Sequence, residues 1–492
     1  MFAVPEADRL TQQAELLRAN GDRDGAERLL QTALEADPGH LLAMTRLAEI
    51  AVDRKDAARA ETLARSVLAR EAAFAPAWGA LAHAAWLSGN LREGLRHARR
   101  AVEIQPQNPH LRLLLVQILI WLHRHRDVPA LLAPLLADDQ PLPYLRARAM
   151  NLMGEMEVAV GNCAAADRWF RGALALVPDF AAVRLALGMN RLRQGDYAEG
   201  LREYEIRSQV TFFQPAGPSQ RSGRPWRGED LRGRSILIED EQGFGDAINF
   251  FRYIPLIRAR GAARIVLHTY PPLLPLFRES DPALELVDRR PEGFAPDYHC
   301  FSASLPFAFE TRIETIPRDV PYLRAPPLQE RPQMRLPANG RKRIGLVWSG
   351  DPRHLRDHLR SIPAARFLAL ADRTDVEFVS LQASVRSSDR AALASRPAVW
   401  RMGDQFRDYG DTAAVLQQLD LVIGVDTSVV HLAGALGLPV WILLPLSPDW
   451  RWVLGRDDTP WYPTARLFHC DGRGWAPVLR RVGAALDAFA TG

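Results

Sequence analysis

The sequence has little cysteine, and its three cysteines are far apart, at Cys163, Cys300 and Cys470. This spacing gives no Cys-x-x-Cys pair and no metal-binding pattern, and it fits a reducing compartment. No apolar run without a charged residue reaches 18 residues. The N-terminal residues also lack the basic segment and apolar core of a signal peptide. We therefore expect a cytoplasmic protein without a signal peptide or a membrane span.

Long runs of like charge are missing too. The 62 Lys and Arg residues are interleaved with 58 Asp and Glu residues, which leaves a net charge of +4. No module of interleaved aromatic and basic residues stands out, so we expect no nucleic-acid partner. A hydrophobic content of 47% is ordinary for a globular protein, and 492 residues are enough for more than one domain.

A short turn signal recurs through roughly the first 205 residues, mostly at intervals of about 34 residues. A second signal that ends in proline runs in phase with it, at Pro38, Pro106 and Pro178. Leu- and Ala-rich stretches with a period near 3.6 lie between, such as 75–87 and 91–104. The pattern predicts helix–turn–helix pairs. The main turn signals are Ala19–Asp22, Arg54–Asp56, Ser88–Asn90, Val160–Asn162 and Gln194–Asp196.

These pairs resemble tetratricopeptide repeats. Ala164–Phe170 and Tyr197–Tyr204 match the second-helix pattern, whereas the unit Leu111–Asp138 is degenerate. About six units are enough for a stacked solenoid. The resemblance implies a concave surface that binds a protein partner; the alternative is an array that only supports the second half of the chain.

The pattern changes after the repeats. Residues 214–231 are rich in Pro and Gly and predict a linker or an ordered arm. From Ser235 onward, strands alternate with helices: we expect a strand at 236–239, a helix at 247–260 and a strand at 264–268. A second alternating set begins at Arg343. Such alternation predicts parallel sheets covered on both faces.

The expected fold class is therefore α plus α/β, an α-solenoid followed by two doubly wound lobes. We expect tetratricopeptide repeats over 1–207 and a linker over 208–233. The first lobe then spans 234–338, and the second spans 339–492 with a C-terminal helix.

The segment Asp420–Pro445 carries the clearest chemical signal. Its apolar run 421–425 predicts a buried parallel strand, and Asp426, Thr427 and Ser428 stand where a short helix begins. Open α/β sheets bind ligands at the carboxyl ends of their strands, and a helix N-terminus favours phosphate. His431 falls in the first turn. The simpler interpretation is that Thr427 and Ser428 are ordinary caps and His431 is a core histidine.

The same segment resembles the Asp-Thr-x-x-x-His-Leu-Ala-x-Ala-Leu-Gly-x-Pro signature of the heptosyltransferase-like family, glycosyltransferase family 9. Ile236–Tyr253 and Ile344–Ile362 resemble two further motifs of this family, in family order, and the tail Leu446–Trp452 resembles members fused to tetratricopeptide repeats. The resemblance implies a bacterial, inverting glycosyltransferase of the GT-B fold that needs neither a metal nor a cofactor. The first lobe would take the acceptor, and the second the nucleotide-sugar donor.

Negative charge builds on the departing diphosphate in such a reaction, so N–H groups, helix dipoles and cations must stabilise it. Arg360 is the expected cation, with Arg356 as an alternative. No lysine matches the donor-lobe lysine of lipopolysaccharide heptosyltransferases, so the donor need not be ADP-heptose. The expected donor-binding residues are Ser349, Gly350, Arg360, Asp426, Thr427, Ser428, Val429 and His431.

The acceptor hydroxyl needs a general base. The resemblance assigns this role to Asp246, next to the loop residues Gln242, Gly243 and Gly245, whose glycines allow the backbone to approach a ligand. Asp246 could instead only cap its helix, and residues 239–241 offer competing carboxylates. If Asp246 is the base, Asp246→Asn abolishes transfer and leaves donor binding intact.

Three functions are consistent with this pattern. The first is a glycosyltransferase whose repeats select a protein acceptor, such as flagellin or another surface protein. The second is a transferase acting on lipopolysaccharide or polysaccharide. The third is a non-catalytic repeat scaffold with a degenerate transferase fold, against which the intact Asp246, Asp426, Thr427 and His431 argue.

Overall fold

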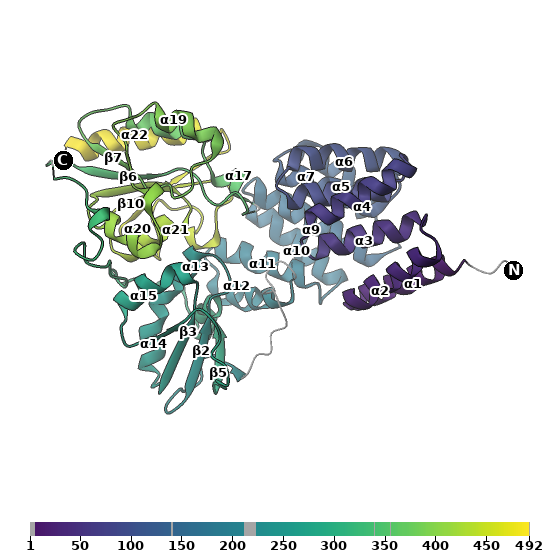
Figure 1. Ribbon diagram of the computed structural model, residues 1–492, viewed down its shortest axis with the longest axis horizontal. Coiled ribbons are helices and arrows are strands. Elements are labelled where there is room, and N and C mark those ends of the chain that lie inside the picture. Colours follow the sequence, from purple (N-terminus) through teal and green to yellow (C-terminus); the bar gives the residue numbers. More distant parts are fainter. Residues whose placement is uncertain (1–4, 139–140, 211–222, 339, 355, 492) are drawn as a thin grey trace. The chain divides into compact units, whose positions relative to one another are not determined.

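The computed structural model describes residues 5–138, 141–210, 223–338, 340–354 and 356–491 (Figure 1). The chain forms two compact units. The first comprises Met1–Ala159 and Ala164–Pro178, and the second comprises Val160–Cys163 and Asp179–Gly492. Among the described residues, no helix is both long and apolar enough to cross a membrane.

Antiparallel helix pairs build the first unit, and the first three predicted turn signals each lie between the two helices of one pair. Gly21 and Gly89 turn the chain in the left-handed region, with φ of 88° and 74°, which glycine adopts without steric cost. The side chains of Asp22 and Asn90 then cap the next helices. The helices are α1 Glu6–Ala19, α2 Arg23–Ala36, α3 Leu41–Asp53, α4 Ala57–Arg70, α5 Ala75–Leu87, α6 Leu91–Ile104, α7 Pro109–Trp121, α8 Val128–Leu136, α9 Pro143–Ala159 and α10 Cys163–Leu176.

The interior of this array changes along the chain. Alanines such as Ala26, Ala43 and Ala60 are fully buried in the early pairs, because a methyl group lets neighbouring helices approach closely. Around the degenerate unit, leucine, isoleucine and methionine fill the core instead. Its second helix, α8, is short and contains Pro134, which cannot donate to the helical ladder.

The last helix pair belongs to the second unit. Helices α11 (Ala181–Arg193) and α12 (Tyr197–Tyr204) share one hydrophobic core with the sheets that follow. Trp461 donates through Nε1 to the Tyr197 hydroxyl at 2.9 Å, and Leu454 donates its N–H to the carbonyl of Arg193 at 2.8 Å. The sixth repeat is therefore part of the structure that carries the sheets.

The Pro/Gly-rich stretch lies partly outside the described residues, which exclude 211–222. Its described part forms an ordered arm. Strand β1 (Arg224–Pro225) pairs in parallel with β5 (Tyr298–Phe301), and Trp226 and Leu231 are buried in the core.

The first sheet has five parallel strands in the order β1-β5-β2-β3-β4. The single helix predicted for 247–260 is wrong: α13, a 3-10 turn and α14 replace it, with Pro255 in the first turn of α14, where its missing N–H interrupts the ladder. The elements are β2 Ser235–Glu239, α13 Phe244–Phe250, α14 Ile254–Ala259, β3 Arg264–His268, α15 Leu274–Ser280, β4 Glu285–Val287, β5 Tyr298–Phe301 and α16 Leu305–Ala308.

The second sheet has six parallel strands in the order β11-β10-β9-β6-β7-β8. Helices α19 and α22 cover one face, and α20 and α21 cover the other (Figure 1), so the predicted two-sided cover is confirmed. The elements are β6 Arg343–Val347, α17 Asp357–Arg360, α18 Ala364–Phe367, β7 Glu377–Ser380, α19 Arg390–Ala394, β8 Trp400–Arg401, α20 Tyr409–Leu416, β9 Leu421–Val425, α21 Ser428–Ala435, β10 Val440–Leu444, β11 Ala465–His469 and α22 Trp475–Thr491.

Candidate anion site at the carboxyl edge of the second sheet

Helix α21 begins directly after the buried strand β9. Thr427 stands at the N-cap in extended conformation, but its hydroxyl makes no capping bond, so it is not an ordinary side-chain cap. This hydroxyl is buried and has no hydrogen-bond partner among the described residues. The Ser428 hydroxyl accepts from Tyr409 at 2.6 Å. The N–H groups of Ser428 and Val429 have no acceptor within the helix, as at any helix start.

His431 lies in the first turn of α21. Its Nδ1 is 2.9 Å from the Tyr462 hydroxyl and its Nε2 is 3.6 Å from Asp426 Oδ1. The ring stacks on Trp452 with centroids 5.0 Å apart. Burial favours the neutral imidazole, but the neighbouring Tyr462 hydroxyl and the hydrogen bond and charge of Asp426 outweigh it and raise the pKa of His431 to about 9. Burial would raise the pKa of Asp426, but His431 and Arg360 lower it to about 2. The pair is therefore ionised near neutral pH.

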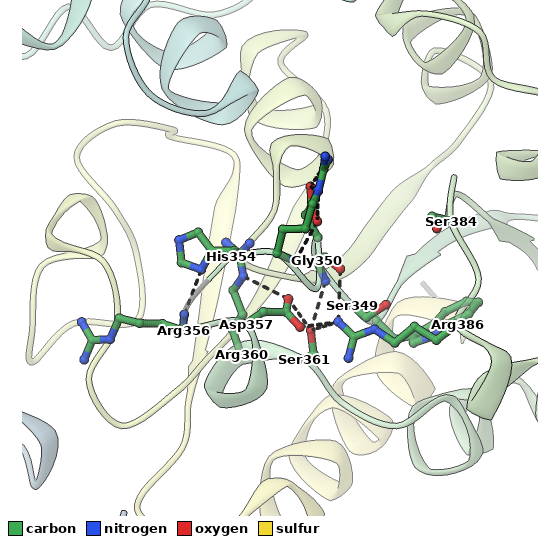
Figure 2. Close-up of polar contacts among 12 residues, drawn as sticks. Ser349, Gly350, His354, Arg356, Asp357, Arg360, Ser361, Ser384 and Arg386 are labelled. Carbon is green, nitrogen blue, oxygen red and sulfur yellow. Dashed lines mark hydrogen bonds and ion pairs between the residues drawn. The ribbon is translucent and has the colours of Figure 1, made fainter. Parts of the chain in front are cut away.

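Ser349 and Gly350 follow the neighbouring strand β6, but their backbone N–H groups are already used (Figure 2). Ser349 donates to Gln382 Oε1 and Gly350 to Ser361 Oγ, both at 3.1 Å. What remains is the Ser349 hydroxyl, which is buried without a partner among the described residues. Any contact of Ser349 with a ligand would come from this hydroxyl.

Asp357 organises the loop after β6 (Figure 2). It is buried, accepts from the Ser361 hydroxyl at 2.8 Å and forms an ion pair with Arg386. Its Oδ1 is also 3.7 Å from Nε of Arg360. The guanidinium of Arg360 is thus held beside Asp357 and close enough to Asp426 to lower the pKa of that carboxyl. Arg356, the alternative cation, shares the loop and donates its N–H to His354 Nδ1 at 3.3 Å.

Asp246 lies near the start of α13 and makes two contacts. Its Oδ2 accepts from the N–H of Gly243 at 2.9 Å, which caps the helix, and its Oδ1 accepts from Arg451 Nη2 at 2.5 Å. Arg451 is buried and also pairs with Asp449. Burial would lower the pKa of Arg451, but the two carboxylates raise it above its ordinary value. Asp246 is therefore both a helix cap and half of an ion pair.

The loop before α13 contacts the start of α21 through Gly245. A Cβ atom at Gly245 would lie 2.9 Å from His431 Cδ2 and 3.5 Å from the Cα of Ser428. Because real Cβ atoms do not approach so closely, only glycine fits there. The structure thus brings together the sequence-predicted residues Gly245, Ser428 and His431. Gln242, in the same loop, donates instead to the Tyr204 hydroxyl at 2.7 Å.

Sequence reasoning missed several residues that hold the site in place: Tyr409, Tyr462 and Arg451, together with Asp357 and Arg386. For Arg451 a signal was available, since an arginine between two tryptophans in an apolar tail is unusual for a solvated surface. The ion pairs of Asp357 and the hydrogen bonds of the tyrosines join distant segments, which local sequence does not encode.

Taken together, the carboxyl ends of β6 and β9 present a helix N-terminus, two buried hydroxyls and two cations. The hydroxyls are those of Ser349 and Thr427, and the cations are Arg360 and His431. This set fits an anion with several oxygen acceptors. Within the described ranges, no group of three His, Cys, Asp or Glu side chains is placed to hold a metal ion.

The class of the chain follows from its helix pairs and sheets: a helical repeat solenoid of the tetratricopeptide type precedes a region with parallel sheets. A family model for the tetratricopeptide repeat matches residues 17–84. The protein FlbA of Caulobacter vibrioides (strain ATCC 19089 / CIP 103742 / CB 15) is 29% identical in an alignment 374 residues long that covers 70% of this chain and 61% of FlbA. The chain is thus a repeat-containing protein related to FlbA, and it spans less than two thirds of that relative's length.

Solved structures of repeat proteins resemble parts of the chain. The tetratricopeptide protein TTC0263 of Thermus thermophilus is 19% identical, with a TM-score of 0.34, and covers 38% of this chain and 99% of its own. The type IV pilus biogenesis factor PilW is 20% identical, with a TM-score of 0.34, and covers 44% of this chain and 97% of its own. Scores this low carry no argument about function.

Proposed function

We propose that the protein is a glycosyltransferase that moves a sugar from a nucleotide-sugar donor to a protein acceptor. The two sheet-bearing lobes would form a GT-B fold, with the donor on the second lobe. The observation that carries the proposal is the buried hydroxyl of Thr427 at the start of α21, next to the cation His431. This hydroxyl has no hydrogen-bond partner in the part of the chain that the structure describes. A buried polar group without a partner costs stability, so its presence favours a ligand that completes it.

The chemistry would follow from the charges around α21. As the bond between sugar and diphosphate breaks, negative charge grows on the leaving phosphate. The N-terminal N–H groups of α21, the imidazolium of His431 and the guanidinium of Arg360 can stabilise that charge. The protein's own groups would thus suffice, so we take the reaction to be metal-independent and, following the family resemblance, inverting.

The repeats would choose the acceptor. Stacked helix pairs present extended surfaces that commonly bind proteins, and a protein acceptor such as flagellin or another surface protein fits this arrangement. Mass spectrometry of surface proteins from cells with and without the gene tests this part. Loss of a sugar mass from one protein would support it, and loss from lipopolysaccharide alone would favour the second function.

Donor binding is tested by calorimetry with UDP-, GDP-, ADP- and CMP-sugars on the full chain. We expect heat with at least one donor and, for that donor, at least tenfold weaker binding by Thr427→Val, which removes only the unpartnered hydroxyl. Thr412→Val is the matched control, because the hydroxyl of this buried threonine of α20 donates to the carbonyl of Asp408, the N-cap of the helix. No heat with any donor would instead favour a non-catalytic scaffold.

The role of the repeats in acceptor recognition is tested with a deletion that removes the early repeats and keeps the sixth. Residues 181–207 share the core of the sheet-bearing unit, and Arg207 pairs with the buried Glu241. A deletion that ends at residue 159 instead leaves the second unit whole. We expect the 160–492 fragment to bind the donor like the full chain and to lose transfer to the protein acceptor.

A further inference from the structure

The first helices of successive pairs carry a line of interacting side chains along the first unit. Consecutive first helices contact one another from α1 to α9. Arg18 of α1 forms an ion pair with Glu49 of α3 at 2.5 Å. Trp86 of α5 packs edge-to-face on Trp121 of α7, with ring centroids 5.3 Å apart. Helices α1, α3, α5, α7 and α9 therefore share one side-chain surface, which we call the first-helix face.

Three carboxylates on the first-helix face are bonded within it. Glu49 forms ion pairs with Arg18 and Arg46. Asp53 also pairs with Arg18. Glu155 of α9 accepts hydrogen bonds from two side-chain amides, both at 2.8 Å. A basic partner would have to break these contacts before it could pair with a carboxylate, so the face is poorly suited to one.

Two donors near the middle of the face have no such partner. Trp86 Nε1 is buried and makes no hydrogen bond to any residue that the structure describes, whereas Trp78 Nε1, in the first turn of the same helix, donates to the Ala72 carbonyl at 2.9 Å. Arg148 of α9 forms no ion pair within the described part of the chain. Burial lowers the pKa of His83, and the charge of Arg148 acts in the same direction, so the guanidinium lies near this ring.

The unused indole N–H of Trp86 points to a missing acceptor. A buried tryptophan usually finds a partner for its N–H, and a buried donor without one calls for an explanation. The ring of Trp86 is partly exposed and lies 6.1 Å from that of His83 by centroids. Tryptophan and arginine are enriched at the centres of protein interfaces, where they combine apolar area with hydrogen-bond donors.

We propose that the first-helix face binds a segment of the acceptor protein that joins an acidic side chain to an apolar one. A backbone carbonyl of the segment would accept from Trp86 Nε1, and its carboxylate would pair with Arg148. The apolar side chain would pack on the indoles of Trp86 and Trp121. Charge complementarity favours an acidic partner, because the carboxylates of the face are bonded and Arg148 is not. The identity of this partner as the acceptor rests on the proposed function.

A display library of random dodecapeptides, selected on the full-length chain, provides the probe. We expect enrichment of peptides that carry Asp or Glu together with an apolar residue. The strongest of them is labelled with a fluorophore and titrated with each variant by fluorescence anisotropy. Trp86→Phe keeps an aromatic ring and removes the N–H, so affinity should fall about fivefold. Arg148→Gln removes a charge-assisted contact, so affinity should fall by about tenfold or more.

Two matched controls separate recognition from stability. Trp78→Phe loses the bond to the Ala72 carbonyl, so it should melt at a lower temperature and bind the peptide like the wild-type chain. Arg99 is an exposed arginine of α6, the second helix of its pair, and forms no ion pair among the described residues. Arg99→Gln removes the same charge away from the first-helix face, so it should leave peptide affinity unchanged.

Several results would overturn the proposed site. They are a selection of peptides rich in Lys and Arg, a selection without enrichment, and wild-type affinity in either Trp86→Phe or Arg148→Gln. A dimer of the full chain in sedimentation that Trp86→Phe dissociates would assign the face to a second copy instead. The selected peptide should inhibit transfer to the acceptor and leave calorimetric donor affinity unchanged, and transfer without inhibition would exclude the acceptor as the partner. Peptide binding by a chain that binds no sugar donor would overturn the proposed function and keep the site.

Discussion

Gly245 shows how closely single atoms constrain the loop before α13. A methyl group at this position would lie 2.9 Å from the imidazole of His431. We expect Gly245→Ala to lower the free energy of unfolding by about 1 to 3 kcal/mol through overpacking, and to weaken donor binding because it displaces His431. Chemical denaturation and calorimetry measure the two effects.

Gly483 provides the matched control. It lies in α22, and a Cβ atom there would have its nearest neighbour, Leu370 Cδ2, at 3.9 Å. We expect Gly483→Ala to be neutral or to stabilise by up to about 1 kcal/mol, since alanine is the better helix former. Equal losses in the two variants would contradict the special role of Gly245.

The His431–Asp426 pair predicts a pH dependence of stability. The pKa of His431 is raised from its ordinary 6.5 to about 9, and the pKa of Asp426 is lowered from 3.8 to about 2, so the pair's stabilisation is complete between pH 3.8 and pH 6.5. It is lost as the pH rises from 6.5 through about 9. We expect the melting temperature of the wild-type chain to fall over this interval more than that of His431→Gln. Parallel curves for the two proteins would show that the histidine is not charged.

At the scale of elements, a substitution at the start of α21 should change donor affinity without lowering the stability of the fold. The Thr427 hydroxyl has no partner to lose among the described residues, so we expect Thr427→Val to leave the free energy of unfolding unchanged or slightly higher while donor affinity drops. Thermal melts alongside calorimetry check this combination. A clear loss of stability would mean that the hydroxyl has a structural partner instead.

The sequence was informative about elements with strong local signals. Helices α5 and α6 and strand β9 match the predicted ranges 75–87, 91–104 and 421–425, because periodicity and turn residues define them locally. The helix predicted for 247–260 was wrong, since Pro255 interrupts it. Apolar periodicity continues through the interruption and conceals it.

The site was predictable only in part, for a physical reason. A polar triplet after an apolar strand located Thr427 and Ser428 at a helix start. The partner of Asp246, however, is 205 residues away, and the used N–H groups of Ser349 and Gly350 depend on side chains from other segments. Tertiary folding decides such pairings, so a sequence offers Asp246 as a candidate without showing what it contacts.

At the scale of the whole molecule, the division of the chain predicts which fragments fold. We expect residues 160–492 to unfold in one cooperative transition. The fragment 208–492 should aggregate or melt far lower, because it lacks helices α11 and α12, whose buried side chains belong to the core of the sheets, and Arg207, the ion-pair partner of Glu241. Circular dichroism melts of both fragments decide this, and equal melting temperatures would contradict the structural role of the sixth repeat.

The union of the sixth helix pair with the sheets has a consequence for how such chains diversify. Whole pairs can be gained, lost or exchanged before Pro178 without removing a residue from the core beneath the candidate site. Under the proposed function, acceptor choice would then evolve by exchange of the first five pairs, while the sixth pair would be inherited together with the sheets. An engineer who wants a new target would graft a foreign array at this same junction.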